Sequence, residues 1–226
     1  MTSGLVHATG VILAKELRTE FRSRELLGTT LVFVLIVIVL FSFTFNPTTS
    51  ESRRFGPGLL WLAFLFAGSL MLQPSFLREQ TNDTLAGLRL APIDPFSILA
   101  GKMAANFLFL LLVEVTLLPV FAVLYNLSIL PVLGQLLLVL ALGTIGLATT
   151  GTVFSAVAAQ ARLRELLLPL LLLPVLAPVL IASTEATVGV LSDPSELSLV
   201  WLTFLISFDV VFLTAAWLVG EYLLEE

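Results

Sequence analysis

The chain has 226 residues, of which 58% are hydrophobic and only 12% are charged. A soluble domain is about half apolar and a quarter charged. Here the apolar excess is arranged in long runs, which indicates an integral membrane protein. There is no cysteine, so disulfides, thiolate metal sites and cysteine catalysis are excluded. The net charge of −5 says little about partners, because most of the surface of such a protein faces lipid.

Residues 9–25 precede the first apolar run and are predicted to form an amphipathic helix. Leucine and phenylalanine recur every four residues along it, and its basic residues line another side: Lys15, Arg18 and Arg22. This pattern favours a helix in the membrane interface, with its basic side towards anionic headgroups. The alternative is an ordinary cytoplasmic extension of the first span.

Six later segments are long and apolar enough to cross a bilayer, which takes about 20 residues. They are residues 26–45, 57–77, 103–125, 129–158, 166–183 and 199–222. The runs are continuous and do not alternate, so we predict one all-α membrane domain over residues 1–226. Pro169, Pro174 and Pro178 predict bends or a break in the fifth segment.

The basic residues predict the orientation of these spans. With both termini in the cytoplasm, nine of the eleven Lys and Arg residues lie on the cytoplasmic side, and only Arg53 and Arg54 lie on the other. Short loops rich in Lys and Arg stay in the cytoplasm. We therefore expect a multi-pass membrane protein with two cytoplasmic termini.

The polar stretch 78–102 is the cytoplasmic loop between the second and third spans. Its middle resembles a short amphipathic helix, because Leu85 and Leu88 share a face and Asp83 suits a helix start. Pro92 and Pro95 then end it. We predict that this coupling helix contacts a soluble partner. Its contact residues would be Arg78, Glu79, Asp83, Thr84, Leu85, Leu88, Arg89 and Pro92. The alternative is that the leucines lie on the headgroup layer.

No motif in the sequence predicts catalysis. Gly101-Lys102 is followed by Met103, and Phe96 stands where a P-loop has its first glycine, so the chain cannot hydrolyse ATP by that machinery. The H-E-x-x-H and G-x-S-x-G motifs are also missing. A membrane enzyme is therefore disfavoured, and we expect no metal site and no directly bound cofactor.

Two acidic residues lie in the middle of predicted spans, Glu114 in the third and Asp209 in the sixth. A carboxyl group at that depth is costly and is a functional candidate by default. The alternative is an uncharged acid that hydrogen-bonds inside the bundle, to hydroxyls such as those of Thr116 or Ser207. No Lys or Arg lies at that depth to pair with either acid.

Taken in order, these features resemble the membrane subunits of ABC-2 type exporters. More narrowly, the chain resembles the haem exporter protein B (CcmB) family, the permease of the cytochrome c maturation system. The segments that carry the likeness are Pro57-Gly58-Leu59-Leu60-Trp61, Phe76–Lys102, Gly143-Thr144-Ile145-Gly146-Leu147, and Leu166-Leu167-Leu168-Pro169 with Pro174 and Pro178. They follow the family order over nearly the whole chain.

One departure from the family pattern bears on the loop. The family loop reads acidic-Gly-(Ser/Thr)-Leu-Glu, whereas here Asp83 takes the place of the glycine and Ala86 that of the glutamate. A salt bridge from that glutamate to an ATPase is therefore not expected in this chain.

The resemblance implies two permease copies working with two copies of a CcmA-like cytoplasmic ATP-binding subunit. It also implies a CcmC-like haem-handling membrane subunit and a CcmE-like periplasmic haem chaperone, with haem as the molecule handled and no nucleic acid. On this interpretation, ATP hydrolysis in the partner drives haem delivery or release of the haem-loaded chaperone. The competing hypothesis is an ion-coupled carrier that uses Glu114 and Asp209 as proton sites.

Overall fold

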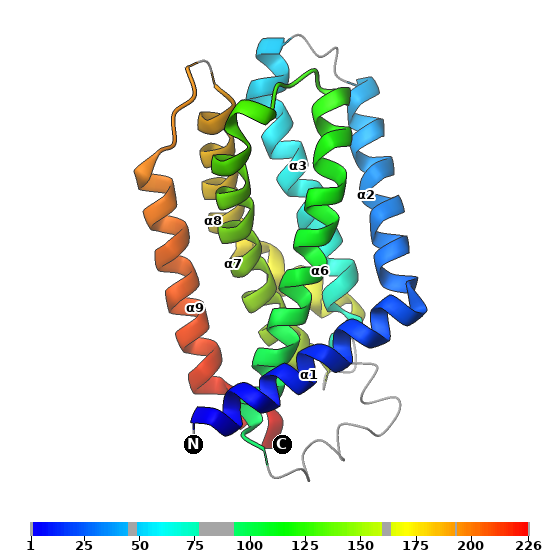
Figure 1. The fold of residues 1–226 in the computed structure, drawn as a ribbon, viewed down its shortest axis with the longest axis vertical. Coiled ribbons are helices and arrows are strands. Elements are labelled where there is room, and N and C mark those ends of the chain that lie inside the picture. The colour runs from blue at the N-terminus through cyan, green and yellow to red at the C-terminus, as the bar shows by residue number, and fades with distance from the viewer. Residues whose placement is uncertain (1, 45–48, 77–92, 160–163, 193, 226) are drawn as a thin grey trace.

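The computed structural model describes residues 2–44, 49–76, 93–159, 164–192 and 194–225. All regular elements within these ranges are helices, which confirms the predicted all-α class. They are α1 (Thr2–Ser23), α2 (Glu25–Thr44), α3 (Thr49–Leu72), α6 (Pro95–Leu124), the short 3-10 helix η1 (Leu130–Val132), α7 (Leu133–Ala159), α8 (Arg164–Leu191) and α9 (Leu199–Glu225). Six of them, all except α1 and η1, run side by side along the long axis, and α1 lies across one end (Figure 1).

The six long helices are the predicted membrane spans. Each contains a stretch of 19 to 30 residues with a mean hydropathy of 1.8 to 2.8, which is long and apolar enough to cross a bilayer. The number of spans is therefore confirmed. An even number of spans places the N- and C-termini at the same end of the bundle, where α1 also lies (Figure 1).

A sharp corner separates α1 from α2. Helix α1 runs from Thr2 to Ser23, so both of its ends come earlier than those of the predicted helix, residues 9–25. Arg24 then adopts a left-handed backbone conformation with φ 55°, which breaks the helical path. The Glu20 carboxylate accepts a hydrogen bond of 2.9 Å from the Leu27 N–H, one of the donors left free at the start of α2. This cap holds α1 across the end of the bundle.

The start of α6 corrects the predicted limits of the loop. The sequence places residues 95–102 in the polar loop and takes Pro95 as an end of its short helix, but these residues form the first two turns of α6. Asp94 caps the helix by accepting a 2.8 Å hydrogen bond from the Phe96 N–H. Proline has no N–H to lose at the first helical position, so Pro95 favours a start there instead of an end.

Helix α7 packs against α3, α6, α8 and α9 and forms the centre of the bundle. Its small residues permit this close approach. A Cβ atom at Gly143 would lie 2.2 Å from the Trp61 ring, and one at Gly151 would lie 2.2 Å from a Leu72 methyl. Gly143 therefore requires glycine, because the Trp61 ring cannot give way, whereas at Gly151 the flexible Leu72 side chain could move aside.

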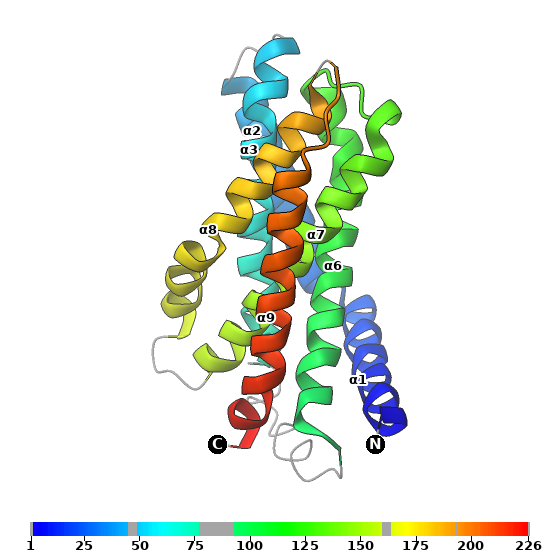
Figure 2. The ribbon, with the colours of Figure 1, turned by 90° about the vertical axis from the view of Figure 1, so that its left-hand side faces the viewer.

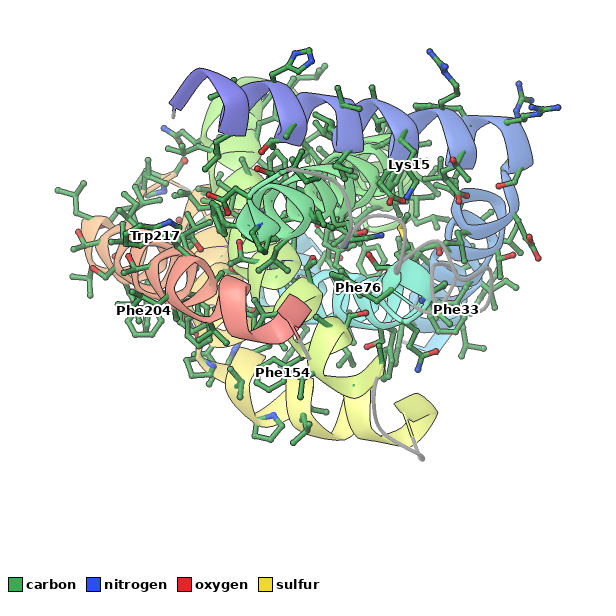
Figure 3. The ribbon with its side chains drawn as sticks, turned by 90° about the horizontal axis from the view of Figure 1, so that it is seen from below. Lys15, Phe33, Phe76, Phe154, Phe204 and Trp217 are labelled. Atoms are coloured by element: carbon green, nitrogen blue, oxygen red, sulfur yellow. The ribbon has the colours of Figure 1, made fainter. Side chains whose placement is uncertain are left out.

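Helix α8 is longer than predicted and continuous, so the predicted break is wrong, but Figure 2 shows a bend along it. The predicted span ended at Ser183, but the helix continues to Leu191. Pro174 and Pro178 are exposed, so their rings lie on the outer face and do not interrupt the packed one. The N-terminal part of α8 lies apart from the other helices in two perpendicular views (Figures 2 and 3).

Candidate functional site

Among the described residues, Lys102 is the most deeply buried charged side chain at the end of the bundle that carries α1. Only 1% of its side chain is exposed. Its ammonium group lies 2.8 Å from a carboxylate oxygen of Glu16 on α1, and donates a 2.5 Å hydrogen bond to the Ser75 carbonyl just beyond α3. It also lies 4.9 Å from the centre of the Phe76 ring. One cation therefore joins three separate elements.

Further side chains hold the same end of α3. Asn106, one turn after Lys102, donates hydrogen bonds of 3.3 Å to the Ser75 hydroxyl and 2.9 Å to the Thr152 hydroxyl on α7. Ser155, also on α7, donates a 2.7 Å hydrogen bond to the Leu72 carbonyl. We name this group the polar junction. Its members are Glu16, Leu72, Ser75, Lys102, Asn106, Thr152 and Ser155.

The electrostatics of the polar junction favour an ionised pair. Burial by itself raises the pKa of Glu16, but the Lys102 ammonium and the nearby Lys15 outweigh it, so this pKa lies below its ordinary value of 4.5. Lys15 contacts the same carboxylate oxygen at 3.0 Å but is far more exposed than Lys102. Glu16 is therefore charged at neutral pH and holds α1 against α6.

The residue before Lys102 lets α1 come close enough for this pair to form. A Cβ atom at Gly101 would lie 2.6 Å from the Ile12 Cβ and 3.0 Å from the Thr9 carbonyl oxygen. Only glycine fits where two helix backbones approach so closely. The Gly101-Lys102 dipeptide thus has a structural explanation. Glycine provides the crossing point, and lysine provides the ion pair.

The polar junction lies where the predicted coupling loop joins the bundle. Phe76 is the last described residue before the loop and its ring contacts Lys102, which pairs with Glu16 of α1. Figure 3 views the bundle from below and labels Phe76 and Lys15 of α1. The predicted partner-contacting residues lie in 77–92, outside the described residues, and their role stays a prediction: Arg78, Glu79, Asp83, Thr84, Leu85, Leu88, Arg89 and Pro92. The structure thus describes the base of the loop on both sides.

The basic residues predicted to face lipid headgroups are all on α1. Arg18 and Arg22 are exposed, and so is Lys15, which also pairs with Glu16. The side of α1 that faces the bundle repeats every four residues, at the buried Ala8, Ile12 and Glu20 and the half-buried Glu16. The basic residues therefore lie away from the bundle, as a headgroup contact requires, but the contact itself stays a prediction.

The two mid-span acids are both buried and have different surroundings. The Thr144 hydroxyl on α7 lies 2.7 Å from each carboxyl oxygen of Glu114. The suggested partner Thr116 instead donates to the Leu112 carbonyl of its own helix. Neither oxygen of Asp209 has a hydrogen-bond partner in the described part of the chain, and Ser207 is exposed. The named partners Thr116 and Ser207 are therefore wrong, but a hydroxyl partner inside the bundle is confirmed for Glu114.

Sequence reasoning missed most of the polar junction. From the sequence, Lys102 is a basic loop residue and part of a failed P-loop match, and Glu16, Asn106 and Thr152 are not singled out. A weak signal did exist, because a lysine and an asparagine one turn apart at the start of an apolar run need buried partners. In the described residues, no three acidic or histidine side chains gather as a metal site would require.

Comparison with known proteins shows which family the chain belongs to. The sequence model of the CcmB protein family matches residues 7–219, which include the polar junction, the loop and all six spans. The chain belongs to the CcmB protein family.

Individual CcmB relatives agree over most of their length. The protein named "Heme exporter protein B" of Pseudomonas aeruginosa is 35% identical over 198 residues, which cover 86% of this chain and 87% of the relative. Its namesake in Rhodobacter capsulatus is 34% identical over 174 residues, covering 77% and 79%. That of Bradyrhizobium diazoefficiens is 30% identical over 189 residues, covering 83% and 84%. Family membership and six spans together make this a multi-pass membrane protein.

Proposed function

We propose that this CcmB chain is the membrane permease subunit of an ABC-type exporter that handles haem during cytochrome c maturation. Family membership and relatives named "Heme exporter protein B" support the haem-export role. The observation that carries the mechanism is the polar junction, which ties both sides of the cytoplasmic loop to α1 and α7. The subunit itself is non-catalytic, and a separate CcmA-like subunit hydrolyses ATP.

The geometry supports a mechanical route from the loop into the bundle. A push on residues 83–90 acts on the end of α3 and the start of α6, since these flank the loop. Lys102 and Asn106 hold both of these ends together, and Asn106 and Ser155 pass the displacement on to α7. Such a packed bundle shifts between discrete arrangements instead of deforming smoothly. ATP-driven closure of the partner would select one of them.

The assembly follows from the same proposal. Two permease copies work with two CcmA-like subunits in the inner membrane, and both termini face the cytoplasm. A CcmC-like membrane subunit and a CcmE-like periplasmic chaperone handle haem beside them. Haem carries anionic propionates, and the middle of this bundle offers the acids Glu114 and Asp209 instead of a cation. This favours ATP-driven release of the haem-loaded chaperone over passage of haem through this subunit.

One observation favours a second candidate, an ion-coupled carrier. Asp209 is buried between α9 and α7 and has no hydrogen-bond partner among the described residues. A carboxyl group that binds and releases a proton would have such surroundings. Conservative substitution of the two mid-span acids separates the candidates, as set out in the Discussion.

The loop provides the direct test. We expect Leu88→Asp to abolish co-purification of the ATP-binding subunit, because apolar anchors carry most of an interface's energy and rim charges carry little. Arg89→Ala is the matched control and should retain most of the partner. Undiminished recovery with a double Leu85→Asp, Leu88→Asp variant would rule out docking through this helix and would favour the headgroup-contact alternative.

The cysteine-free sequence also makes the orientation easy to measure. Single cysteines at Asn82 and Ser50 should react with a membrane-impermeant thiol reagent from opposite sides of the membrane. In intact cells the cysteine at position 82 should stay unlabelled, and it should react only after the membrane is permeabilised. Labelling of Asn82 from the outside would contradict the proposed topology and with it the loop mechanism.

A further inference from the structure

A small second hydrophobic core lies next to the polar junction, at the end of the bundle that carries α1. It includes both sides of the cytoplasmic loop, because Phe76 precedes the loop and Ile93 and Phe96 follow it. Its other members are Ile98, Leu99 and Met103 of α6, Val153, Ala156 and Ala159 of α7, and Ala216 of α9. The base of the loop therefore packs against α9 as well as α7.

Helix α9 reaches this core through a glycine. A Cβ atom at Gly220 would lie 3.2 Å from a ring carbon of Phe96, 3.5 Å from a Leu99 methyl and 3.7 Å from the Phe96 Cα. The C-terminal end of α9 lies beside the start of α6 in two perpendicular views (Figures 1 and 2). A displacement of the first turn of α6 is therefore passed to α9 by direct contact.

Hydrogen bonds hold α7 in the bundle, but they do not hold α9. Helix α7 is bonded to α6 through Thr152 and to α3 through Ser155. Within residues 199–220, the described side chains of α9 make no hydrogen bond to another helix, and Thr214 donates to the Val210 carbonyl of α9 itself. Apolar contacts are not directional, so helices that touch only through them can shift without breaking a specific bond. Helix α9 is therefore less fixed than α7.

The middle of α9 contains a group that disfavours its contact with α7. Asp209 is only 5% exposed, and neither of its carboxyl oxygens has a hydrogen-bond partner in the described part of the chain. One of these oxygens lies 3.0 Å from the position of a Cβ atom at Gly146, so the acid is packed against the α7 backbone. Burying a polar group without a partner is costly, and water removes that cost when the helices separate. The α7–α9 contact is therefore easier to open at Asp209 than a fully apolar contact.

The far end of α9 is fixed, in contrast to its middle. The Gly189 carbonyl of α8 accepts hydrogen bonds of 2.9 Å from the Glu196 N–H and 2.7 Å from the Ser192 hydroxyl. Ser195 donates a 3.1 Å hydrogen bond to the Gln135 side chain near the start of α7. The described residues of the α8–α9 connection thus tie the start of α9 to two neighbouring helices.

We propose that Phe96 and Gly220 couple the cytoplasmic loop to α9, which tilts about its far end and opens its contact with α7. Asp209 lies roughly 15 Å from the start of α9 and a similar distance from Gly220, at 1.5 Å per residue. Movement of the loop end of α9 therefore exposes Asp209 to water. Phe96 and Gly220 are positioning residues, because they act through α9. This coupling rests on the proposed function, since ATP-driven closure of the partner supplies the displacement.

Labelling of a single cysteine measures the opening. Thr150 is fully buried on α7, one turn after Gly146 and on the same face, so Thr150→Cys in the otherwise cysteine-free chain reports on this contact. The variant is purified with its ATP-binding subunit and treated with a small water-soluble methanethiosulfonate. We expect labelling about tenfold faster with ATP and vanadate than without nucleotide, because the labelling rate follows the population of the open state. Ala105→Cys, in the main core, is the control and should label slowly in both states.

Equal labelling rates at position 150 in the two states, with the ATP-binding subunit bound and hydrolysing ATP, would overturn the coupling and leave the proposed function standing. Failure of the unsubstituted chain to retain an ATP-binding subunit would contradict the proposed function, and the coupling with it.

Further variants assign the opening to the contact between α6 and α9. Phe96→Ala removes the ring that Gly220 contacts and should abolish the nucleotide-dependent increase while the ATP-binding subunit stays bound. Gly220→Val, which separates α9 from α6 without changing the loop, should have the same effect, and Phe96→Leu should restore much of the increase. Trp217→Ala is the matched control, because Trp217 is 58% exposed near the same end of α9. An undiminished increase in Phe96→Ala or Gly220→Val would overturn the coupling.

Discussion

At the α1 end of the bundle, the Lys102 ammonium contacts a carboxylate, a carbonyl oxygen and an aromatic ring. At mid-height, Glu114 contacts a single hydroxyl, and Asp209 contacts no described polar partner. Both regions bury ionisable groups, but at mid-height Asp209 is left without a hydrogen-bond partner among the described residues. A fully satisfied polar network rigidifies the segments that it joins, whereas an unsatisfied group stores a penalty. The comparison suggests that the rigid part of the molecule surrounds the loop, and that the middle of the bundle is adaptable.

The largest expected effect comes from breaking the rigid region. Lys102→Met should lower the free energy of unfolding by roughly 3 kcal/mol, because it leaves Glu16 and the Ser75 carbonyl without their buried partner. Denaturant titration in detergent, followed by circular dichroism, measures this. Lys15→Met is the matched control, since Lys15 contacts the same oxygen from an exposed position, and should change stability by less than about 1 kcal/mol. Equal losses for both variants would contradict the rigid junction.

A second variant tests how closely α1 must approach the bundle. Gly101→Ala places a methyl group 2.6 Å from the Ile12 Cβ. Overpacking of this kind costs about 1–3 kcal/mol, and hydrogen exchange along α1 should become faster. Gly10→Ala is the control, because nothing lies within 4 Å of its new methyl group. A Gly101→Ala protein as stable as the wild type would show that α1 is only loosely attached.

The pH dependence of stability sharpens the comparison further. The pKa of Glu16 is depressed in the folded protein, so its contribution to stability is present above its ordinary value of 4.5 and is lost as pH falls through the depressed pKa. Unfolding midpoints measured between pH 7 and pH 3 should therefore fall by less in Glu16→Gln than in the wild type. Parallel curves for the two proteins would mean that the ion pair contributes nothing.

The smallest effects are expected at mid-height. Glu114→Gln keeps a carbonyl oxygen that can accept from Thr144, and Asp209→Asn removes no hydrogen bond with a described residue, so each should change stability by less than about 1 kcal/mol. Under the proposed function, haem-dependent cytochrome c maturation should stay nearly intact in cells carrying either variant. Loss of maturation at normal expression would instead favour the ion-coupled carrier.

The sequence alone determined the class of the molecule and the number of its spans, because insertion of an apolar run into lipid depends on the local stretch of chain. It also supplied the likeness to the CcmB family, but the partner-contacting role of residues 78–92 stays a prediction. The sequence predicted the ends of helices less accurately, because α6 already begins at Pro95 and α8 continues beyond Ser183. A proline can start a helix as well as stop one, and polar residues such as Glu185 can continue a helix at the membrane surface.

Only the tertiary structure decided which polar groups meet. Glu16 and Lys102 are separated by 86 positions, and Glu114 and Thr144 by 30. Their pairing depends on which face each helix turns towards its neighbours, and a nearly uniform apolar run gives little sign of that face. The close approaches at Gly101 and Gly143 bring those faces together. The amino-acid composition thus determined which segments lie in lipid and which in water. Helix packing determined which partner each buried charged group contacts.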